Sequence, residues 1–162
     1  AVTEVVQMME SVDNAIHALK KIATELRPGI LDTLGLPSSI EWLGTEFERK
    51  TGIACEIDID TKELRLEKDF SICFFRICQE DLTNISKHAA CSQVEISLLQ
   101  HNSELTLIVK DNGKGMSSAK LENPFSMGLL GMRERAHNID SDLLVTSTKN
   151  KGTSIQLTAQ IN

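Results

Sequence analysis

The first regular pattern in the chain is a row of apolar residues between positions 2 and 26. The pattern contains no Gly or Pro, and its apolar residues are spaced alternately four and three apart, at Val5, Met9, Val12, Ile16, Leu19, Ala23 and Leu26. This spacing is the heptad seam of a helix that packs against another helix. We therefore predict a coiled-coil-like helix that forms half of a helical hairpin and mediates a homodimer. The alternative is that the helix packs back on its own domain.

Downstream of this helix the apolar pattern changes its period several times. Apolar residues three and four apart predict helices, and strict alternation of apolar and polar residues predicts strands. The patterns predict helices over residues 37–51, 69–89 and 129–139, and strands over 53–59, 93–100, 104–110, 142–148 and 153–161. Residues 30–36 are expected to form a short turn. The order of elements predicts an α+β fold, a two-layer sandwich with helices on one face of a mixed sheet.

Composition narrows the class of protein. The chain has 162 residues, 41% of them apolar and 25% charged, and a net charge of −6, which argues against direct nucleic-acid binding. No apolar run reaches the ~18 residues that a membrane span needs. We expect a cytoplasmic segment, attached to a membrane, if at all, only through regions upstream. The four cysteines form no C-x-x-C pair, so we expect reduced thiols rather than a metal or redox motif.

The loop that follows Asp111 is the first candidate for chemistry. Glycine pairs lie at its two ends, Gly113 with Gly115 and Gly128 with Gly131. Glycine lets the backbone approach a ligand closely, and the second pair lies where the next helix begins and offers N–H groups to phosphate. Asp111, at the end of a strand, suits an exocyclic amine. The pattern indicates a nucleotide loop, with an ordinary surface loop as the alternative.

The helix predicted just before the hairpin carries a second candidate site. Arg76, Glu80, Asn84 and His88 are each four residues apart, with Lys87 beside them. Residues four apart are neighbours on a helix surface, so this face would present a carboxylate, an amide, an amine and an imidazole together. Carboxylate and amide oxygens suit Mg²⁺, and a lysine suits phosphate. The alternative is a solvated helix face without a ligand.

Five motifs resemble those of the sensor histidine kinases of two-component systems. Q-E-D-L-T-N-I-S-K-H-A (residues 79–89) resembles their N-box, D-N-G-K-G-M (111–116) their first glycine box, and K-G-T-S-I-Q-L (151–157) their closing strand. G-L-L-G-M-R-E-R-A (128–136) resembles the second glycine box of the nitrate-sensor and DesK-like subfamily. L-R-P-G-I-L-D-T-L-G-L (26–36) resembles that subfamily's junction between the second dimerisation helix and the ATP-binding domain. The resemblance covers nearly the whole chain.

The resemblance implies a Bergerat-type (GHKL) ATP-binding fold over residues 28–162, with ATP and Mg²⁺ as ligands. Residues 1–27 would be part of the second helix of the dimerisation hairpin. Asp111 would bind the adenine amino group, supported by Thr153. Asn84 would ligate Mg²⁺, and Glu80 would be the catalytic residue that positions the metal or its waters. The other ATP-binding residues implied are Lys87, His88, Gly113, Gly115, Met116, Gly128, Leu129, Leu130, Gly131 and Met132.

As a function, the resemblance implies transfer of the γ-phosphoryl group of Mg·ATP to a histidine, and then to an aspartate of a response regulator. The regulator would commonly have a helix-turn-helix output domain. The family's phosphoacceptor motif does not occur here, since His17 is followed by Ala18. The acceptor histidine is therefore expected outside this chain, which alone should not autophosphorylate. Two alternatives are an ATP-hydrolysing conformational switch of the same fold and a non-catalytic dimerisation module with a degraded site.

Overall fold

The computed structural model describes residues 8, 11–12, 29–61, 64–123 and 126–161. Within the predicted seam helix the described residues are Met8, Ser11 and Val12, and these three are helical. The rest of that helix lies outside the described residues. The seam, the homodimer and the boundary after residue 27 therefore stay predictions.

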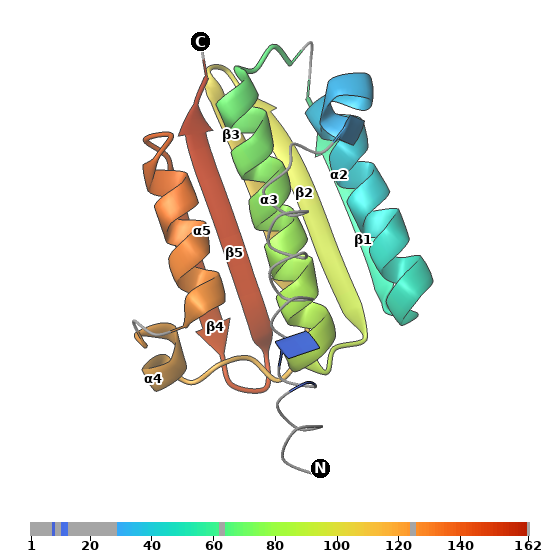
Figure 1. The fold of residues 1–162 in the computed structure, drawn as a ribbon, viewed down its shortest axis with the longest axis vertical. Coiled ribbons are helices and arrows are strands. Elements are labelled where there is room, and N and C mark those ends of the chain that lie inside the picture. The colour runs from blue at the N-terminus through green and yellow to red at the C-terminus, as the bar shows by residue number, and fades with distance from the viewer. Residues whose placement is uncertain (1–7, 9–10, 13–28, 62–63, 124–125, 162) are drawn as a thin grey trace.

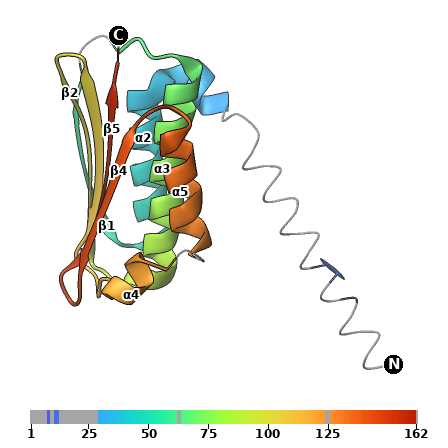
Figure 2. The ribbon, with the colours of Figure 1, turned by 90° about the vertical axis from the view of Figure 1, so that its left-hand side faces the viewer.

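The described chain forms two layers, a five-stranded sheet and helices packed on one of its faces (Figures 1 and 2). The sheet has the order β1-β2-β3-β5-β4; β1 pairs parallel with β2, and every other pair is antiparallel. This is the predicted α+β sandwich with a mixed sheet. The elements are α2 (Gly29–Thr51), β1 (Ala54–Asp60), α3 (Lys68–Asn84), η1 (Ile85–Ala89), β2 (Gln93–His101), β3 (Glu104–Asp111), α4 (Ser118–Leu121), α5 (Met127–His137), β4 (Asp142–Thr148) and β5 (Gly152–Gln160).

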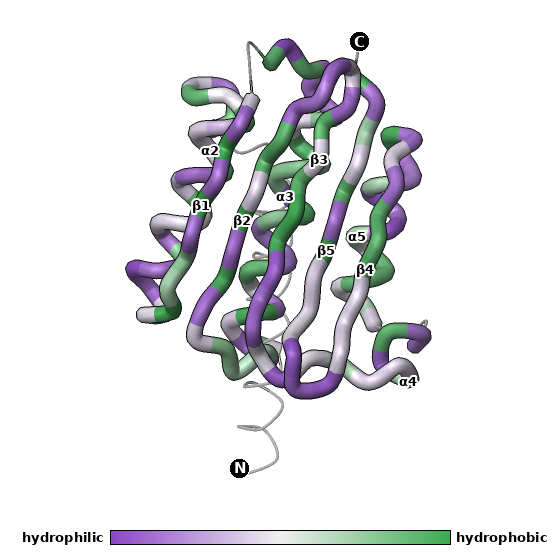
Figure 3. The backbone as a smooth tube through the Cα atoms, turned by 180° about the vertical axis from the view of Figure 1, so that it is seen from behind, coloured by the Kyte–Doolittle hydropathy of each residue, from purple (hydrophilic) through white to green (hydrophobic). Residues whose placement is uncertain are grey.

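The alternation of the strands explains why only one face of the sheet is covered. Along β2, β3 and β5, every second side chain is buried beneath the helices, and the side chains between them lie on the other face. The colours along the strands in Figure 3 change between hydrophilic and hydrophobic residues, as this arrangement requires. The buried set of the three central strands is Val94, Ile96, Leu98, Leu105, Leu107, Val109, Ile155, Leu157 and Ala159.

Helix α2 corrects the prediction of a turn over residues 30–36. Helical structure already begins at Gly29, and the change of direction is confined to Gly35, whose φ of 74° and ψ of 176° are not helical. Glycine tolerates this positive φ. Pro37 follows in the first turn of the second segment, where its missing N–H costs nothing. The buried Ser39 hydroxyl donates to the Gly35 carbonyl at 2.6 Å and fastens the kink.

Helix α3 corrects the predicted column of polar residues. The α-helix ends at Asn84 and continues as one π-helical turn, η1, which contains Lys87 and His88. Ala90, with φ 50°, then ends the helix. The predicted spacing of four residues therefore fails beyond Asn84. Arg76 also leaves the predicted surface column, because it is buried and donates to the Gln79 side chain at 2.7 Å.

The four cysteines are divided between the core and half-buried positions. All four cysteines are free thiols, and Cys73 and Cys78 are buried in the core. Burial raises the pKa of Cys55 to about 11 and that of Cys73 to about 12. Within the described ranges, no helix combines the length and the apolar character that crossing a bilayer requires.

Candidate functional site

One cavity brings together the two regions that the sequence singled out. It has a volume of about 360 Å³ and lies at the C-terminal end of α3, against the end of β3 and the loop that carries α4. In Figure 1 this is the end of the domain where α4 is labelled. We call it the Asp111 cavity. Its lining residues are Asp81, Asn84, Ile85, His88, Ala89, Asp111, Lys114, Gly115, Met116, Lys120, Asn123, Ser126, Met127, Gly128, Leu129, Thr153 and Ile155.

Asp111 is the buried acceptor of this cavity, with 3% of its surface exposed. It is the last residue of β3, so the sheet fixes its backbone. Its carboxyl accepts a hydrogen bond from the Gly113 N–H at 2.7 Å. Burial raises the pKa of Asp111, and the backbone N–H groups of Gly113 and Thr153 oppose that rise by stabilising the carboxylate. The result is a fixed acceptor at the wall of a cavity.

The first glycine pair is required by the chain's own backbone. A Cβ atom at Gly113 would lie 2.2 Å from the Ala89 carbonyl oxygen, and one at Gly115, whose φ is +66°, would lie 2.2 Å from the Thr148 carbonyl oxygen. The Lys114 N–H donates to the same Ala89 carbonyl at 2.8 Å. These glycines therefore let the loop pass between η1 and the β4–β5 turn. Of the two, Gly115 also lines the cavity.

Gly128 joins the second glycine box to the N-box. A Cβ atom at Gly128 would lie 3.0 Å from Glu80 Oε1, 3.3 Å from Asn84 Nδ2 and 3.5 Å from Asn84 Oδ1. The start of α5 is thus seated directly against the carboxylate and the amide that the sequence analysis assigned to Mg²⁺. The oxygens of Glu80 and Asn84 suit a cation that takes few protein ligands and completes its coordination with phosphate oxygens. The helix N-terminus beside them favours the phosphate. The residues present therefore fit a magnesium ion bound together with phosphate.

The Ser147 hydroxyl of β4 fixes the start of the loop that follows Asp111. It accepts a hydrogen bond from the Met116 N–H at 2.7 Å and lies 2.8 Å from the Thr153 hydroxyl. The Asn150 N–H also donates to the Lys114 carbonyl at 2.7 Å. Ser147 therefore fixes both Met116 and Thr153, two of the predicted site residues. The sequence analysis missed it, because one serine in an alternating strand carries no distinguishing signal.

Asp81 is the largest omission of the sequence analysis. It is 5% exposed, it lines the cavity, and burial together with the nearby Asp111 and Glu80 raises its pKa to about 8. A signal was present in the sequence. Asp81 lies three residues after Cys78 and four before Ile85, inside the apolar stripe of α3, and a carboxyl in such a stripe must point at the core or at a ligand.

The remaining predicted residues divide into two groups. Asn84, His88, Met116, Leu129 and Thr153 line the cavity, whereas Glu80 lies beside it against Gly128. Five others do not line it: Lys87 and Leu130 are exposed, Gly131 is half-buried, Met132 is in the hydrophobic core, and Gly113 supports the loop. Two lysines also line the cavity, Lys114 and Lys120, which the sequence analysis did not select.

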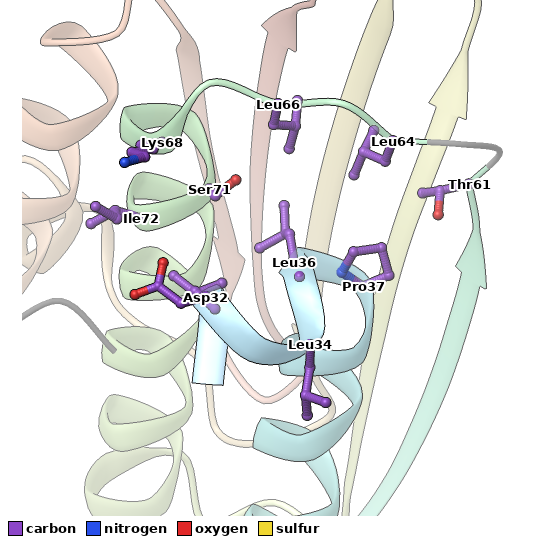
Figure 4. Close-up of a pocket in the computed structure, with 12 residues that line it drawn as sticks. Asp32, Leu34, Leu36, Pro37, Thr61, Leu64, Leu66, Lys68, Ser71 and Ile72 are labelled. Carbon is purple, nitrogen blue, oxygen red and sulfur yellow. The ribbon is translucent and has the colours of Figure 1, made fainter. Parts of the chain in front are cut away.

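A second, larger cavity lies at the opposite end of α3 (Figure 4). Its volume is about 600 Å³, and we call it the junction cavity because it surrounds the kink at Gly35. Leu36, Pro37, Leu64 and Leu66 form an apolar wall, and the charged residues at its border are exposed. No motif in the sequence predicts a ligand for this cavity.

Comparison with known proteins identifies the class to which the fold and the Asp111 cavity belong. A family model described as "Histidine kinase-, DNA gyrase B-, and HSP90-like ATPase" matches residues 71–162, more than half of the chain. The chain therefore belongs to this ATPase family. The matched region contains the N-box, both glycine boxes and the closing strand.

Among curated proteins, the chain is similar to sensor histidine kinases, as its motifs predicted. It is 31% identical to the kinase/phosphatase DegS of Brevibacillus brevis, over 99% of the chain and 42% of that protein. It is 35% identical to LiaS of Bacillus subtilis, over 91% of the chain and 40% of that protein. The chain thus spans about two-fifths of the length of these relatives.

Solved structures confirm the fold. The histidine kinase domain of the blue-light activated kinase of Erythrobacter litoralis matches with a TM-score of 0.67 at 18% identity, over 78% of the chain and 61% of that domain. AdeS of Acinetobacter baumannii matches with a TM-score of 0.68 at 10% identity, over 96% of the chain and 83% of that structure. The predicted Bergerat-type sandwich is therefore confirmed.

Proposed function

We propose that this chain is the ATP-binding catalytic module of a two-component sensor histidine kinase, and that it acts in the cytoplasm, where ATP is available. It binds Mg·ATP in the Asp111 cavity and donates the γ-phosphoryl group to a histidine that lies outside the chain. The acceptor passes the group to an aspartate of a response regulator. The observation that carries the proposal is the convergence of buried Asp111, Asn84 and the Gly128 helix start on one cavity.

Each wall of the cavity has a chemical task under this proposal. Asp111 accepts hydrogen bonds from the exocyclic amine of adenine, and the apolar side chains of Ile85 and Ile155 contact the flat base. Lys114 and Lys120 attract the phosphates. Asn84 and Glu80 would hold the magnesium ion, which when bound neutralises charge on the phosphate oxygens. Catalysis is then mainly positioning and charge neutralisation, as in phosphoryl transfer generally.

Calorimetric titration of Mg·ADP tests the binding step. We expect the native chain to bind and Asp111→Ala to bind at least ~100-fold more weakly, because the substitution removes a buried charged hydrogen-bond acceptor. Asp58→Ala is the matched control, since Asp58 is an exposed residue of β1 away from the cavity. No binding to the native chain would overturn the proposal and favour a non-catalytic dimerisation module.

A phosphotransfer assay separates a kinase from an ATPase switch of the same fold. The chain is incubated with γ-labelled ATP and a separate histidine-bearing helix from the same parent protein. We expect label on that histidine, and none when Asn84→Ala replaces the native chain. Phosphate release at the same rate with and without the helix, and no label on it, would indicate an ATP-hydrolysing switch.

The proposed partners follow from the same role. We propose that residues 2–26 form a homodimer and that a response regulator, commonly one with a helix-turn-helix output domain, receives the phosphoryl group. Sedimentation at high micromolar concentration tests the dimer, and a monomer would contradict it. The heptad spacing in the sequence supports this part of the proposal.

A further inference from the structure

The Ser147 hydroxyl lies between two residues of the proposed ATP site that are far apart in the sequence. It accepts a hydrogen bond from the Met116 N–H at 2.7 Å, and its oxygen lies 2.8 Å from the Thr153 hydroxyl oxygen. Met116 and Thr153 line the Asp111 cavity, whereas Ser147 is not among the described residues that line it. An effect of Ser147 on a ligand in this cavity therefore passes through the residues that it holds.

The backbone of Thr153 is fixed by the sheet, but its side chain is not. Thr153 of β5 is directly opposite Ser147 of β4 in the antiparallel pair of these strands. Its N–H stabilises the Asp111 carboxylate, and Gly152 before it has no room for a Cβ atom against the Asp111 carbonyl. Rotation about the Cα–Cβ bond of a threonine exchanges the positions of its hydroxyl and its methyl group. The contact with Ser147 selects the rotamer that directs the Thr153 hydroxyl toward β4.

The protons of these two hydroxyls can be arranged in two ways, since each hydroxyl has one proton to donate and two lone pairs that accept. In the first arrangement Ser147 donates to the Gly152 carbonyl at 3.2 Å, and Thr153 donates to Ser147. In the second, Ser147 donates to Thr153, whose own proton is then left for a group in the cavity. The 3.2 Å contact is longer than the roughly 2.5–3.0 Å of an ordinary O–H···O bond. A ligand that offers an acceptor therefore selects the second arrangement.

Adenine offers such an acceptor beside the group that Asp111 is proposed to bind. The exocyclic amine of adenine lies between two ring nitrogens, N1 and N7, and each of them accepts a hydrogen bond. A carboxylate only accepts, so Asp111 can bind the amine but not a ring nitrogen. Thr153 is adjacent to the Asp111 carboxyl, which its N–H stabilises. In the second arrangement its hydroxyl is the donor that a neighbouring ring nitrogen requires.

Resting on the function proposed above, we propose that Ser147 is a positioning residue of the nucleobase site. It donates its hydroxyl proton to Thr153, so that the Thr153 hydroxyl becomes a donor to a ring nitrogen of adenine, next to the amine that Asp111 accepts. Through the same oxygen Ser147 holds the Met116 N–H at the start of the loop.

The test compares the affinity for ADP with that for its 1-deaza and 7-deaza analogues, measured by calorimetry with Mg²⁺ present. Each analogue has a C–H group in place of one ring nitrogen and keeps the amine and the phosphates. We expect the native chain to bind one of the analogues about tenfold more weakly than ADP, the loss of one hydrogen bond. In Ser147→Ala this ratio should fall to about threefold or less, because the Thr153 hydroxyl is no longer oriented. A general distortion of the cavity would weaken ADP and its analogues alike and leave the ratio unchanged.

A matched substitution controls for the change itself. Ser154→Ala makes the same replacement at the next position of β5 after Thr153. Ser154 is half-buried like Ser147, but the alternation of the strand places its side chain on the opposite face of the sheet. This variant should retain the native ratio for both analogues.

Two further variants keep the test independent of the folding of Ser147→Ala. Ser147→Thr retains the hydroxyl and should retain the native ratio, whereas Thr153→Val removes the donor itself and should bring the ratio close to one. Added to Thr153→Val, Ser147→Ala should not change the ratio again, because Ser147 acts on the base through Thr153. A ratio in Ser147→Thr as low as that in Thr153→Val would overturn the proposal.

The outcomes separate this inference from the proposed function. If the native chain does not bind ADP, both are wrong. If it binds ADP and both analogues equally well, or if Ser147→Ala retains the native ratio, the role of Ser147 is wrong and the ATP-binding function stands.

Discussion

The two cavities at the ends of α3 differ in a way that volume does not reveal. The junction cavity is the larger, about 600 Å³ against about 360 Å³, and it is walled by leucines. Its border charges, Asp32 and Lys68, are exposed, whereas Asp81 and Asp111 are buried in the wall of the smaller cavity. Buried charge is costly unless it is used. Here buried carboxyl groups, and not size, distinguish the cavity in which we propose that the chemistry occurs.

The largest expected effect comes from the junction cavity and concerns stability alone. Leu36 is 3% exposed and packs beside the kink. Leu36→Ala should lower the free energy of unfolding by about 3 to 4 kcal/mol, because it removes buried methyl groups beside an existing cavity. Chemical denaturation measures this loss. ADP affinity, measured at a temperature where the variant is folded, should stay within about twofold of native. A loss of affinity above tenfold would show that the two cavities are not independent.

The second effect concerns the stability cost of the smaller cavity. The pKa of Asp81 is raised from 3.8 to about 8 in the folded chain. A raised acidic pKa favours the folded state below the unfolded pKa, and this contribution is lost as pH rises toward the folded pKa. Asp81→Asn should therefore gain stability over the native chain progressively between pH 4 and pH 8, reaching about 2 to 3 kcal/mol. Urea denaturation across this range measures the difference. A difference that does not change with pH would contradict the buried acid.

A third effect should appear in ligand binding without a loss of stability. Gly128→Ala places a Cβ atom 3.0 Å from Glu80 Oε1 and crowds Asn84. We expect Mg·ADP affinity to fall about tenfold while the helix keeps its stability, because Ala favours helices over Gly. Gly29→Ala is the control, since a Cβ there meets nothing within 4 Å. Unchanged affinity for Gly128→Ala would show that these two side chains do not meet the ligand.

The smallest effect sets the baseline for the comparison. Leu34 also lines the junction cavity, but it is 52% exposed. Leu34→Ala should change the free energy of unfolding by less than about 0.5 kcal/mol and leave ADP affinity unchanged. A change above about 1 kcal/mol in denaturation would mean that a further surface covers this residue in solution.

The sequence was sufficient for most elements of the fold and for bringing together the residues that its motifs selected. Alternation predicted every strand of the sheet within a few residues, since each strand has one buried face. Asp111, Asn84 and Gly128 were selected by motif, and the structure brings all three to one cavity. The strand predictions succeeded because the period is a property of short segments, whereas the roles of the three motif residues stay predictions.

The features that the sequence analysis missed depend on tertiary structure. The π-helical turn at Ile85–Ala89 breaks the period of 3.6 residues that the polar column assumed, so His88 could not be placed by counting. The N-box motif led to the selection of Glu80 and not of its neighbour Asp81, although the position of Asp81 in the apolar stripe indicated burial. Ser147 acts through Met116 and Thr153, which are distant in sequence. Only the assembled sheet shows such a contact.

The kink at Gly35 has a mechanical consequence for the kinase proposed here. The kink lies beside the N-terminal end of α3, whereas the Asp111 cavity lies at its C-terminal end. The 17 residues of α3 separate the two by a rigid rod of about 25 Å. The continuous described segment begins at Gly29, near the kink, and in the proposed kinase the domain would rotate about this end of α3. Under that proposal, each degree of rotation would carry the cavity by about 0.4 Å, so a small change of angle near the kink would become a large change in the distance that the phosphoryl group must cross.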